Sequence, residues 1–333
     1  MNSHPATRLL QVKRDGNPLR RFGHASPFIG KLGPLDCARL DEIGQLTRVA
    51  LPDLPEPTLV IGMTESSLLL AFWMALWQQK PVDLRFTSRK IRDGDAHRLA
   101  FREPHSHGPQ HYLALERGAR YAQIVIIEDE LTTGATLRNL ILALDGVSNR
   151  VWVATLRDMR LPHLRDELRA ELGARGVDLQ VIALDTLREN LPVEIAPLRP
   201  HFNPFGRTEC SRVAALCELE KQWKTFAPDV IYMVGECVDI ALQWWLRLPE
   251  SGRPNLRQIT RSPWKVDDNA VLSRQIFAAA GQGSRYFLYN FGPPANSRVL
   301  WMAERANASV GALVSEWFAS QEIEARGIVV GGT

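Results

Sequence analysis

The sequence has few cysteines and no long apolar run. Its four cysteines, Cys37, Cys210, Cys217 and Cys237, form no C-x-x-C pair, so their spacing predicts neither a zinc site nor a disulfide framework. The longest apolar stretch, residues 68–77, is too short to cross a bilayer, and the amino terminus contains no apolar signal core. We therefore expect a cytoplasmic protein without a membrane span.

A strong excess of one charge is also absent. The net charge is +3 at pH 7 and no long Lys/Arg tract occurs, so charge gives no support for nucleic-acid binding. The chain has 333 residues, 45% of them hydrophobic, which exceeds one typical domain and supplies enough apolar side chains for two cores. We expect two domains.

The most informative segment is residues 124–136, which read IVIIEDELTTGAT. Its first four residues are apolar and mostly β-branched, as in a buried parallel strand. Glu128 and Asp129 would then emerge at the carboxyl end of this strand, where open α/β sheets bind ligands. Ionised carboxylates only accept hydrogen bonds, so these two predict contact with hydroxyls or a divalent cation.

The loop after the two acids predicts an anion site. Thr132, Thr133 and Thr136 offer hydroxyl donors, and Gly134 lets the backbone approach a ligand closely. Residues 135–144 have a helical pattern, and the amino end of a helix favours anions. A phosphorylated sugar with magnesium satisfies both the acids and the loop.

This segment resembles the phosphoribosyl diphosphate (PRPP) signature of the type I phosphoribosyltransferases. The alternative is an ordinary strand, turn and helix with an acidic turn. The resemblance implies that Glu128 and Asp129 hold the ribose 2′ and 3′ hydroxyls, that Asp129 meets Mg²⁺ through PRPP, and that a loop cradles the 5′-phosphate. The loop residues are Glu130, Leu131, Thr132, Thr133, Gly134, Ala135 and Thr136.

Strand and helix patterns alternate around this segment. Strands are predicted over residues 58–61, 82–87, 151–156 and 179–184, and helices over residues 35–51, 64–79 and 161–175. This order predicts an α/β fold with a mainly parallel, Rossmann-like sheet.

Two further segments fit the phosphoribosyltransferase resemblance. The family's pyrophosphate loop follows the first strand, which assigns to PRPP binding Gly62, Met63, Thr64, Glu65 and Ser66. Arg89 and Lys90 follow the next strand, where the family often carries a basic residue beside the departing pyrophosphate. The alternative for this basic pair is a solvated strand end.

Residues 90–120 show no clear periodic pattern, which predicts a catalytic lid that closes over PRPP. The lid contains His105, His107 and His111. These histidines could bind a transition metal, transfer protons or donate hydrogen bonds to the diphosphate; the alternative is a polar loop in which histidines cluster. Their E-x-H-S-H-x-x-x-H string resembles a bacterial branch of the family.

The second half begins after a proline-rich connector at residues 187–210. Helices are predicted over residues 211–226 and 238–246, and strands over residues 230–234, 256–260 and 285–291. Residues 260–263 read Thr-Arg-Ser-Pro, and the segment resembles the TRSP domain, which follows a phosphoribosyltransferase domain in bacterial gene clusters associated with tellurium resistance and stress. We expect a phosphoribosyltransferase domain over residues 1–200 and a smaller TRSP domain over residues 201–333.

The second domain contains its own candidate pocket, formed by Glu236, Thr260, Arg261 and Ser262. A guanidinium beside a hydroxyl could bind phosphate or carboxylate, or Arg261 could instead close a domain interface. The two halves also share a strand, loop, helix and strand pattern, which duplication or coincidence would explain.

The resemblance therefore implies Mg²⁺-dependent transfer of 5-phosphoribosyl from PRPP to a nitrogenous, nucleobase-like acceptor, with pyrophosphate release, in the synthesis of a nucleoside-like metabolite. The alternative is a PRPP-binding regulator without turnover, with the second domain as its output module. Expected partners are PRPP and a small-molecule acceptor; a homodimer and companion biosynthetic enzymes are compatible with the resemblance. No nucleic acid or membrane partner is expected.

Overall fold

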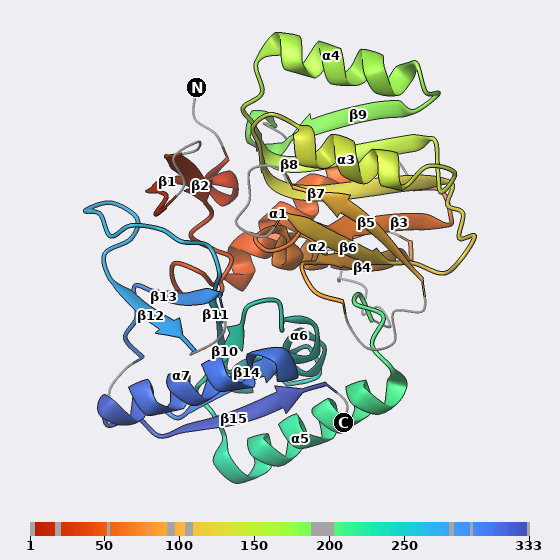
Figure 1. Ribbon diagram of the computed structural model, residues 1–333. Helices are drawn as coiled ribbons and strands as arrows, with labels where there is room; N and C mark the ends of the chain where they lie inside the picture. Colours follow the sequence, from red (N-terminus) through yellow and green to blue (C-terminus); the bar gives the residue numbers. More distant parts are fainter. Residues whose placement is uncertain are drawn as a thin grey trace. The chain divides into compact units, whose positions relative to one another are not determined.

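The chain forms two compact units, each with its own α/β sheet (Figure 1). The computed structural model describes residues 4–16, 21–51, 54–78, 80–91, 97–103, 109–187, 203–279, 283–293 and 296–331. Unit 1 comprises Met1–Leu9 and Cys37–Gly206, and unit 2 comprises Leu10–Asp36 and Arg207–Thr333.

Unit 1 is built on a seven-stranded sheet in the order β5-β6-β4-β3-β7-β8-β9. The parallel strands are β3 (Thr58–Gly62), β4 (Asp83–Ser88), β7 (Gln123–Leu131), β8 (Arg150–Asp158) and β9 (Asp178–Ala183). The prediction of a mainly parallel α/β sheet is thus confirmed for this unit. β3 is buried at all five positions, as expected for a central strand.

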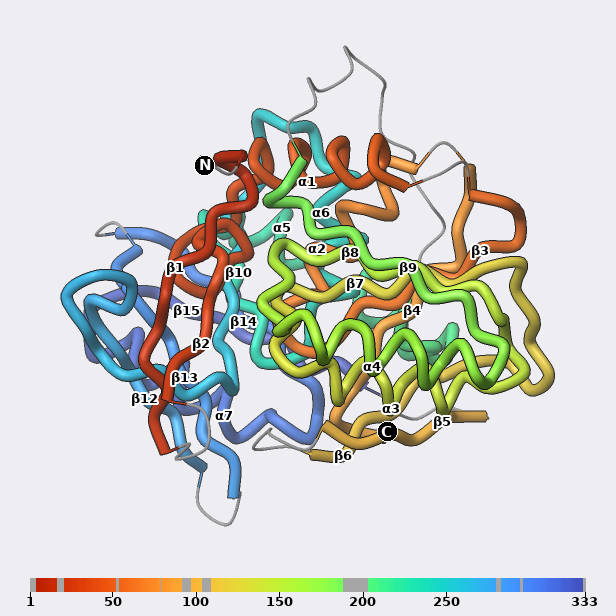
Figure 2. The backbone as a smooth tube through the Cα atoms, turned by 90° about the horizontal axis from the view of Figure 1, so that it is seen from above, coloured from red at the N-terminus to blue at the C-terminus, as the bar shows by residue number. Residues whose placement is uncertain are grey.

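Helices cover both faces of this sheet (Figure 2). They are α1 (Cys37–Ala50), α2 (Ser67–Leu76), α3 (Ala135–Ala143) and α4 (Pro162–Gly173), with 3-10 turns η1 (Pro5–Thr7) and η2 (Leu184–Thr186). Leu59 and Ile126 of the sheet pack in one core with Leu140 of α3 and Leu172 of α4. All ten residues of α2 are buried. No helix in the described ranges is long and apolar enough to cross a membrane.

The segment at residues 90–120, predicted to lack regular structure, contains two strands. β5 (Arg98–Arg102) and β6 (Gln110–Ala114) form an antiparallel hairpin, and β6 pairs with the end of β4. Buried Phe101 and Leu113 alternate with more exposed neighbours, and these short period-two patterns explain the strands. The prediction that this segment lacks regular elements was therefore wrong for these residues, whereas a lid that closes over PRPP stays a prediction.

Unit 2 contains a four-stranded parallel sheet in the order β11-β10-β14-β15. Its strands are β10 (Val230–Val234), β11 (Asn255–Ile259), β14 (Val299–Glu304) and β15 (Ala325–Val330). A hairpin of β12 (Arg274–Ala278) and β13 (Arg285–Tyr289) meets the end of β11 through a bridge between Thr260 and Phe287. The helices are α5 (Glu209–Phe226), α6 (Asp239–Trp245) and α7 (Ala308–Ser320), with 3-10 turns η3 (Glu250–Gly252) and η4 (Arg305–Asn307).

Leu10–Asp36 belong to unit 2, whereas the predicted first domain spans residues 1–200. They contain the hairpin β1 (Leu10–Lys13) and β2 (Phe22–Ala25). The carbonyl of Gly30 accepts from Gln258 N at 2.8 Å, and Leu35 N donates to the carbonyl of Leu256 at 2.8 Å. The amino-terminal segment therefore continues the hydrogen bonding of β11, the edge strand of its sheet.

The assignment of residues 10–36 to unit 2 can be tested with a fragment that comprises residues 207–333. We expect the fragment alone to lack cooperative thermal unfolding, because it loses Val12, Ala25 and Leu32 from an apolar cluster that also contains Trp264. Addition of a peptide comprising residues 10–36 should restore cooperativity in near-UV circular dichroism. A peptide with Val12→Asp should not restore cooperative unfolding, because it would bury a charge. Cooperative unfolding of the fragment alone would contradict the assignment.

Candidate functional site

The predicted ligand residues of unit 1 lie at a topological switch point. The chain leaves β3 toward β4 on one side, whereas β7 and the strands after it lie on the other side. Connections that diverge in this way leave a crevice at the carboxyl ends of the two central strands, where open α/β sheets bind ligands. Thr64 and Glu65 follow β3, and Glu128 and Asp129 lie near the end of β7. The fold thus brings two segments far apart in sequence to the same edge.

Ser67 connects these two segments. Its hydroxyl donates to Glu128 Oε1 at 2.8 Å and accepts from Asp129 N at 2.9 Å. The backbone N of Met63 also donates to the carbonyl of Ile127 at 3.2 Å. The loop before α2 and the acidic end of β7 are therefore held together as one site.

The two acids have an unfavourable electrostatic environment. Burial raises the pKa of Glu128 well above its ordinary value, and the charge of Asp129 raises it further, although the Ser67 hydroxyl lowers it. Asp129 is 8% exposed. Because burying two adjacent carboxylates costs free energy, Glu128 retains a proton to higher pH than an exposed glutamate. Hydroxyl donors or positive charge at this edge would favour its ionised form.

The β3–α2 loop is fixed by β4. Thr64 N donates to Thr87 Oγ1 at 2.8 Å, and the Thr64 hydroxyl donates to the Thr87 carbonyl. A Cβ on Gly62 would lie 2.7 Å from the Cβ of Ala71, so glycine is required there for the close approach of α2 to β3. Ser66 immediately precedes the first residue of α2. The backbone of the predicted pyrophosphate loop is thus held by β4 and by the close packing of α2.

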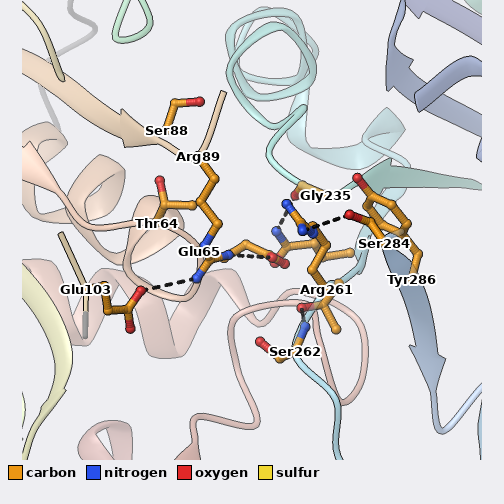
Figure 3. A network of polar contacts seen from close by, with 12 residues as sticks. Thr64, Glu65, Ser88, Arg89, Glu103, Gly235, Arg261, Ser262, Ser284 and Tyr286 are labelled. Carbon is orange, nitrogen blue, oxygen red and sulfur yellow. Dashed lines mark hydrogen bonds and ion pairs between the residues drawn. The ribbon is translucent and has the colours of Figure 1, made fainter. Parts of the chain in front are cut away.

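Arg89, at the end of β4, lies between two carboxylates of unit 1. Its Nη1 is 3.5 Å from Glu65 Oε2 and its Nη2 is 3.6 Å from Glu103 Oε2 (Figure 3). The guanidinium is therefore held beside the β3–α2 loop, and its contact with pyrophosphate stays a prediction. The neighbouring Lys90 donates its backbone N to Ser88 Oγ at 3.0 Å.

Glu103 is the first residue of the E-x-H-S-H-x-x-x-H string, and no role was predicted for it. Besides Arg89, it contacts His111: Glu103 Oε2 is 2.9 Å from His111 Nε2. The His111 ring is fully buried on β6, and its Nδ1 has no hydrogen-bond partner in the described part of the chain. His111 therefore supports Glu103 from within the sheet. His105 and His107 lie outside the described residues.

The predicted phosphate loop forms the turn from β7 to α3. Gly134 has a φ of +83°, a left-handed conformation that favours glycine. A Cβ there would also lie 3.3 Å from side chains of Arg160 and Leu168. The hydroxyl of Thr133 accepts from Ala135 N at 3.3 Å, and Thr133 is exposed.

Of the other loop residues, Leu131 belongs to the core, and the threonines are partly exposed at the carboxyl edge of the sheet. Leu131 is 4% exposed and its carbonyl accepts from Met159 N, so its side chain belongs to the core. Glu130 donates its backbone N to Asp129 Oδ1 at 3.1 Å. Thr132 and Thr136 are partly exposed, and Ala135 begins α3. The threonine hydroxyls are thus available at the amino end of a helix.

The four predicted pocket residues of unit 2 have different surroundings. Glu236 and Thr260 are buried. Thr260 Oγ1 accepts from Ser262 N at 3.0 Å, and the Ser262 hydroxyl lies 3.4 Å from Lys31 Nζ. Arg261 Nη2 donates to Ser284 Oγ at 2.9 Å. Arg261 is the positively charged residue of the four, and its guanidinium lies beside the Ser284 hydroxyl.

In the described ranges, no three His, Cys, Asp or Glu side chains are grouped so as to hold a metal by themselves. The predicted magnesium contact of Asp129 runs through PRPP and needs no such group, so it stays a prediction.

A family model described as phosphoribosyl transferase matches residues 9–186, more than half of the chain. Among solved structures, APRTase from Giardia lamblia complexed with 9-deazaadenine is 17% identical, with coverage of 52% of this chain and 91% of that chain and a TM-score of 0.39. Adenine phosphoribosyltransferase from Rhodothermus marinus is 15% identical, with coverage of 52% and 92% and a TM-score of 0.38. The Leishmania donovani enzyme is 16% identical, with coverage of 64% and 92% and a TM-score of 0.37. No curated protein matches the chain.

The raised pKa of Glu128 predicts that Glu128→Gln stabilises the chain at neutral pH. The folded chain binds a proton that the unfolded chain has released, so the stability linked to Glu128 is complete below its unfolded pKa and is lost as pH rises through the folded one. Glutamine cannot ionise, so the Glu128→Gln variant should be more stable than the parent near neutral pH, where the parent loses the stability linked to its proton.

Thermal unfolding measured between about pH 5 and pH 8.5 tests this prediction. The melting temperature of Glu128→Gln should exceed that of the parent by an amount that increases with pH. Glu167→Gln, at an exposed position of α4, is the matched control and should show no such trend. Identical pH profiles for Glu128→Gln and the parent would contradict the assigned electrostatics.

Proposed function

The chain belongs to the phosphoribosyl transferase family, and we propose that it transfers 5-phosphoribosyl from PRPP to a nitrogenous, nucleobase-like acceptor, with Mg²⁺ and release of pyrophosphate. The observation that carries the proposal is the link made by Ser67, which joins the acids of β7 to the loop after β3. A ribose and its diphosphate need these two groups of residues in one site.

In this reaction the bond from ribose C1 to pyrophosphate breaks, and the electron pair leaves with pyrophosphate. A nitrogen of the acceptor forms the new bond to C1 and loses its proton. Positive charge develops on the ribose as the old bond breaks, and catalysis must stabilise it together with the negative leaving group. Magnesium, bound through PRPP near Asp129, would neutralise part of the diphosphate charge.

Glu128 and Asp129 would hold the ribose hydroxyls. Because burial and mutual repulsion disfavour two charges at this position, the developing positive charge of the ribose would relieve an existing electrostatic cost. Interactions that strengthen as the reaction proceeds lower the barrier, whereas interactions equal in both states do not. The acids thus fit a role in the transition state.

The leaving group would meet Arg89 and the backbone of residues 62–66. Arg89 lies beside two carboxylates, Glu65 and Glu103, which the diphosphate would replace as partners of the guanidinium. Thr132, Thr133 and Thr136 would bind the 5′-phosphate. A nucleoside-like product, and a link to stress and tellurium resistance through the TRSP resemblance, remain predictions.

The reaction is tested by incubating the protein with PRPP, Mg²⁺ and a panel of nitrogenous bases, and measuring pyrophosphate release. Asp129→Asn should reduce turnover at least about a hundredfold, because it removes a charge next to the developing cation. Asp166→Asn, an exposed position on α4, is the matched control. Undiminished turnover in Asp129→Asn would exclude the assigned role, and tight PRPP binding without turnover on any base would favour a regulator.

The contact between Glu103 and Arg89 predicts an effect on PRPP binding. Glu103→Gln retains a side chain that can bond His111 but removes a negative charge that competes with the diphosphate for Arg89. We expect the KM for PRPP to fall about fivefold, equivalent to about 1 kcal/mol, with a smaller change in kcat.

Steady-state kinetics with PRPP as the varied substrate measure this effect. Glu116→Gln, an exposed position after β6, should leave KM unchanged. An unchanged or raised KM in Glu103→Gln would show that Glu103 does not compete for the guanidinium.

A further inference from the structure

Arg160 is a buried cation of unit 1 beside the predicted phosphate loop, and no role was predicted for it. It lies two residues after the end of β8, and its side chain is 2% exposed. Burying a guanidinium costs free energy unless its charge is paired and its donor groups are bonded. The partners of its nitrogens therefore show what this residue can do.

Asp158 fixes the guanidinium of Arg160. Its Oδ1 accepts from Arg160 Nε at 2.9 Å, and its Oδ2 accepts from Arg160 Nη2 at 2.8 Å, a bidentate pair that sets the plane of the group. The backbone N of Arg160 donates to the same Oδ1 at 3.1 Å. The third side-chain nitrogen, Nη1, has no hydrogen-bond partner in the described part of the chain and is not fully buried. One donor nitrogen of a fixed cation thus remains for a ligand.

This nitrogen lies at the amino end of α3. A Cβ on Gly134, the residue before the helix, would lie 3.3 Å from Arg160 Cδ and 3.7 Å from Arg160 Nη1. The first helical hydrogen bond of α3 runs from Arg138 N to the Gly134 carbonyl at 2.8 Å, so the amides of residues 135–137 have no acceptor within the helix. A positive charge and the amides of a helix start therefore meet at one place, which favours an anion.

The charges around Asp158 leave a positive excess. Arg165 of α4 also pairs with this carboxylate, with its Nε 3.2 Å from Asp158 Oδ2. Burial alone would raise the pKa of Asp158, but its hydrogen bonds to Arg160 hold the pKa below its ordinary value. Asp158 is therefore ionised near neutral pH and balances one of two guanidinium charges. A phosphate monoester, which is largely dianionic near neutral pH, complements the remaining charge.

We propose that Arg160 binds the 5′-phosphate of PRPP through Nη1, together with the amides at the start of α3. This inference rests on the proposed function, because it adds a charged residue to the phosphate loop of that same site. The threonines of the loop supply neutral hydroxyls, whereas Arg160 supplies the charge that distinguishes a ribose phosphate from ribose.

Equilibrium dialysis of ribose 5-phosphate against the full chain tests this role without turnover. Arg160→Gln should weaken binding about thirtyfold, within the range for a lost hydrogen bond to a charged group. Arg160→Lys retains the charge but cannot form the bidentate pair with Asp158. It should bind about tenfold more tightly than Arg160→Gln, because attraction between charges needs no fixed fork geometry.

Arg165→Gln is the matched control. It also removes a guanidinium from Asp158, but Arg165 is 44% exposed on α4, so the affinity should change by less than about twofold. Equal losses in Arg160→Gln and Arg165→Gln would show that pairing with Asp158 is what matters, and would overturn the assignment.

Three further results would overturn the role of Arg160. They are an unchanged affinity in Arg160→Gln, equal losses in Arg160→Gln and Arg160→Lys, and a parent protein that binds no ribose 5-phosphate. Equal losses would mean that Arg160 only supports Gly134 by packing. Circular dichroism checks that each variant is folded. If Arg160→Gln fails to fold, the nitrogen-15 NMR signals of the Arg160 guanidinium in the parent decide: they should shift when ribose 5-phosphate is added, and unchanged signals would contradict the contact.

The outcome is independent of turnover, because dialysis measures binding alone. Binding that depends on Arg160 without any pyrophosphate release from PRPP would contradict the proposed transfer and support this inference. Pyrophosphate release together with an undiminished affinity in Arg160→Gln would support the transfer and exclude the role of Arg160.

Discussion

The hydrogen bonds of the Ser67 hydroxyl are the interaction on which the site of unit 1 depends. One hydroxyl has a single proton, and its donation to Glu128 Oε1 leaves a lone pair for Asp129 N. The positions of both acids therefore follow from where α2 begins. That beginning is fixed in turn by the absence of a side chain at Gly62 and by the bonds between Thr64 and Thr87. A wholly buried helix thus determines the geometry of a polar site.

The same packing gives the acids their electrostatic character. Burial beside α2 raises the pKa of Glu128, and the charge of Asp129 adds to this effect. An isolated pair of this kind would reduce stability, since one cation or several donors are needed to satisfy it. A ligand that brings hydroxyls and develops positive charge, as proposed, would stabilise these two carboxylates. The cost in stability and the proposed catalytic role therefore arise from one cause.

The short-range patterns of the sequence were sufficient for much of the fold and for the strand and turn that hold the candidate site residues. β10 lies at the predicted residues 230–234, and the run IVIIEDELTTGAT forms the expected strand, turn and helix start. Glu103 could not be recognised as a partner of Arg89, because their meeting depends on the pairing of Phe101 with His111 across a hairpin. The packing of residues 10–36 with β11 likewise depends on hydrogen bonds between distant segments. Neither feature has a local sequence pattern.

The sheets of the two units have similar central strands but different polar groups at the carboxyl ends of the neighbouring strands. β3 and β10 are each buried at all five positions, and each precedes a fully buried helix. Burial on every side makes such a strand central, so its carboxyl end faces a crevice. The neighbouring strands end differently: β7 ends with two acids and a threonine loop, whereas Glu304 of β14 is already paired with Arg207. Because Glu304 already pairs with Arg207, the end of β14 does not repeat the arrangement of the two acids of β7.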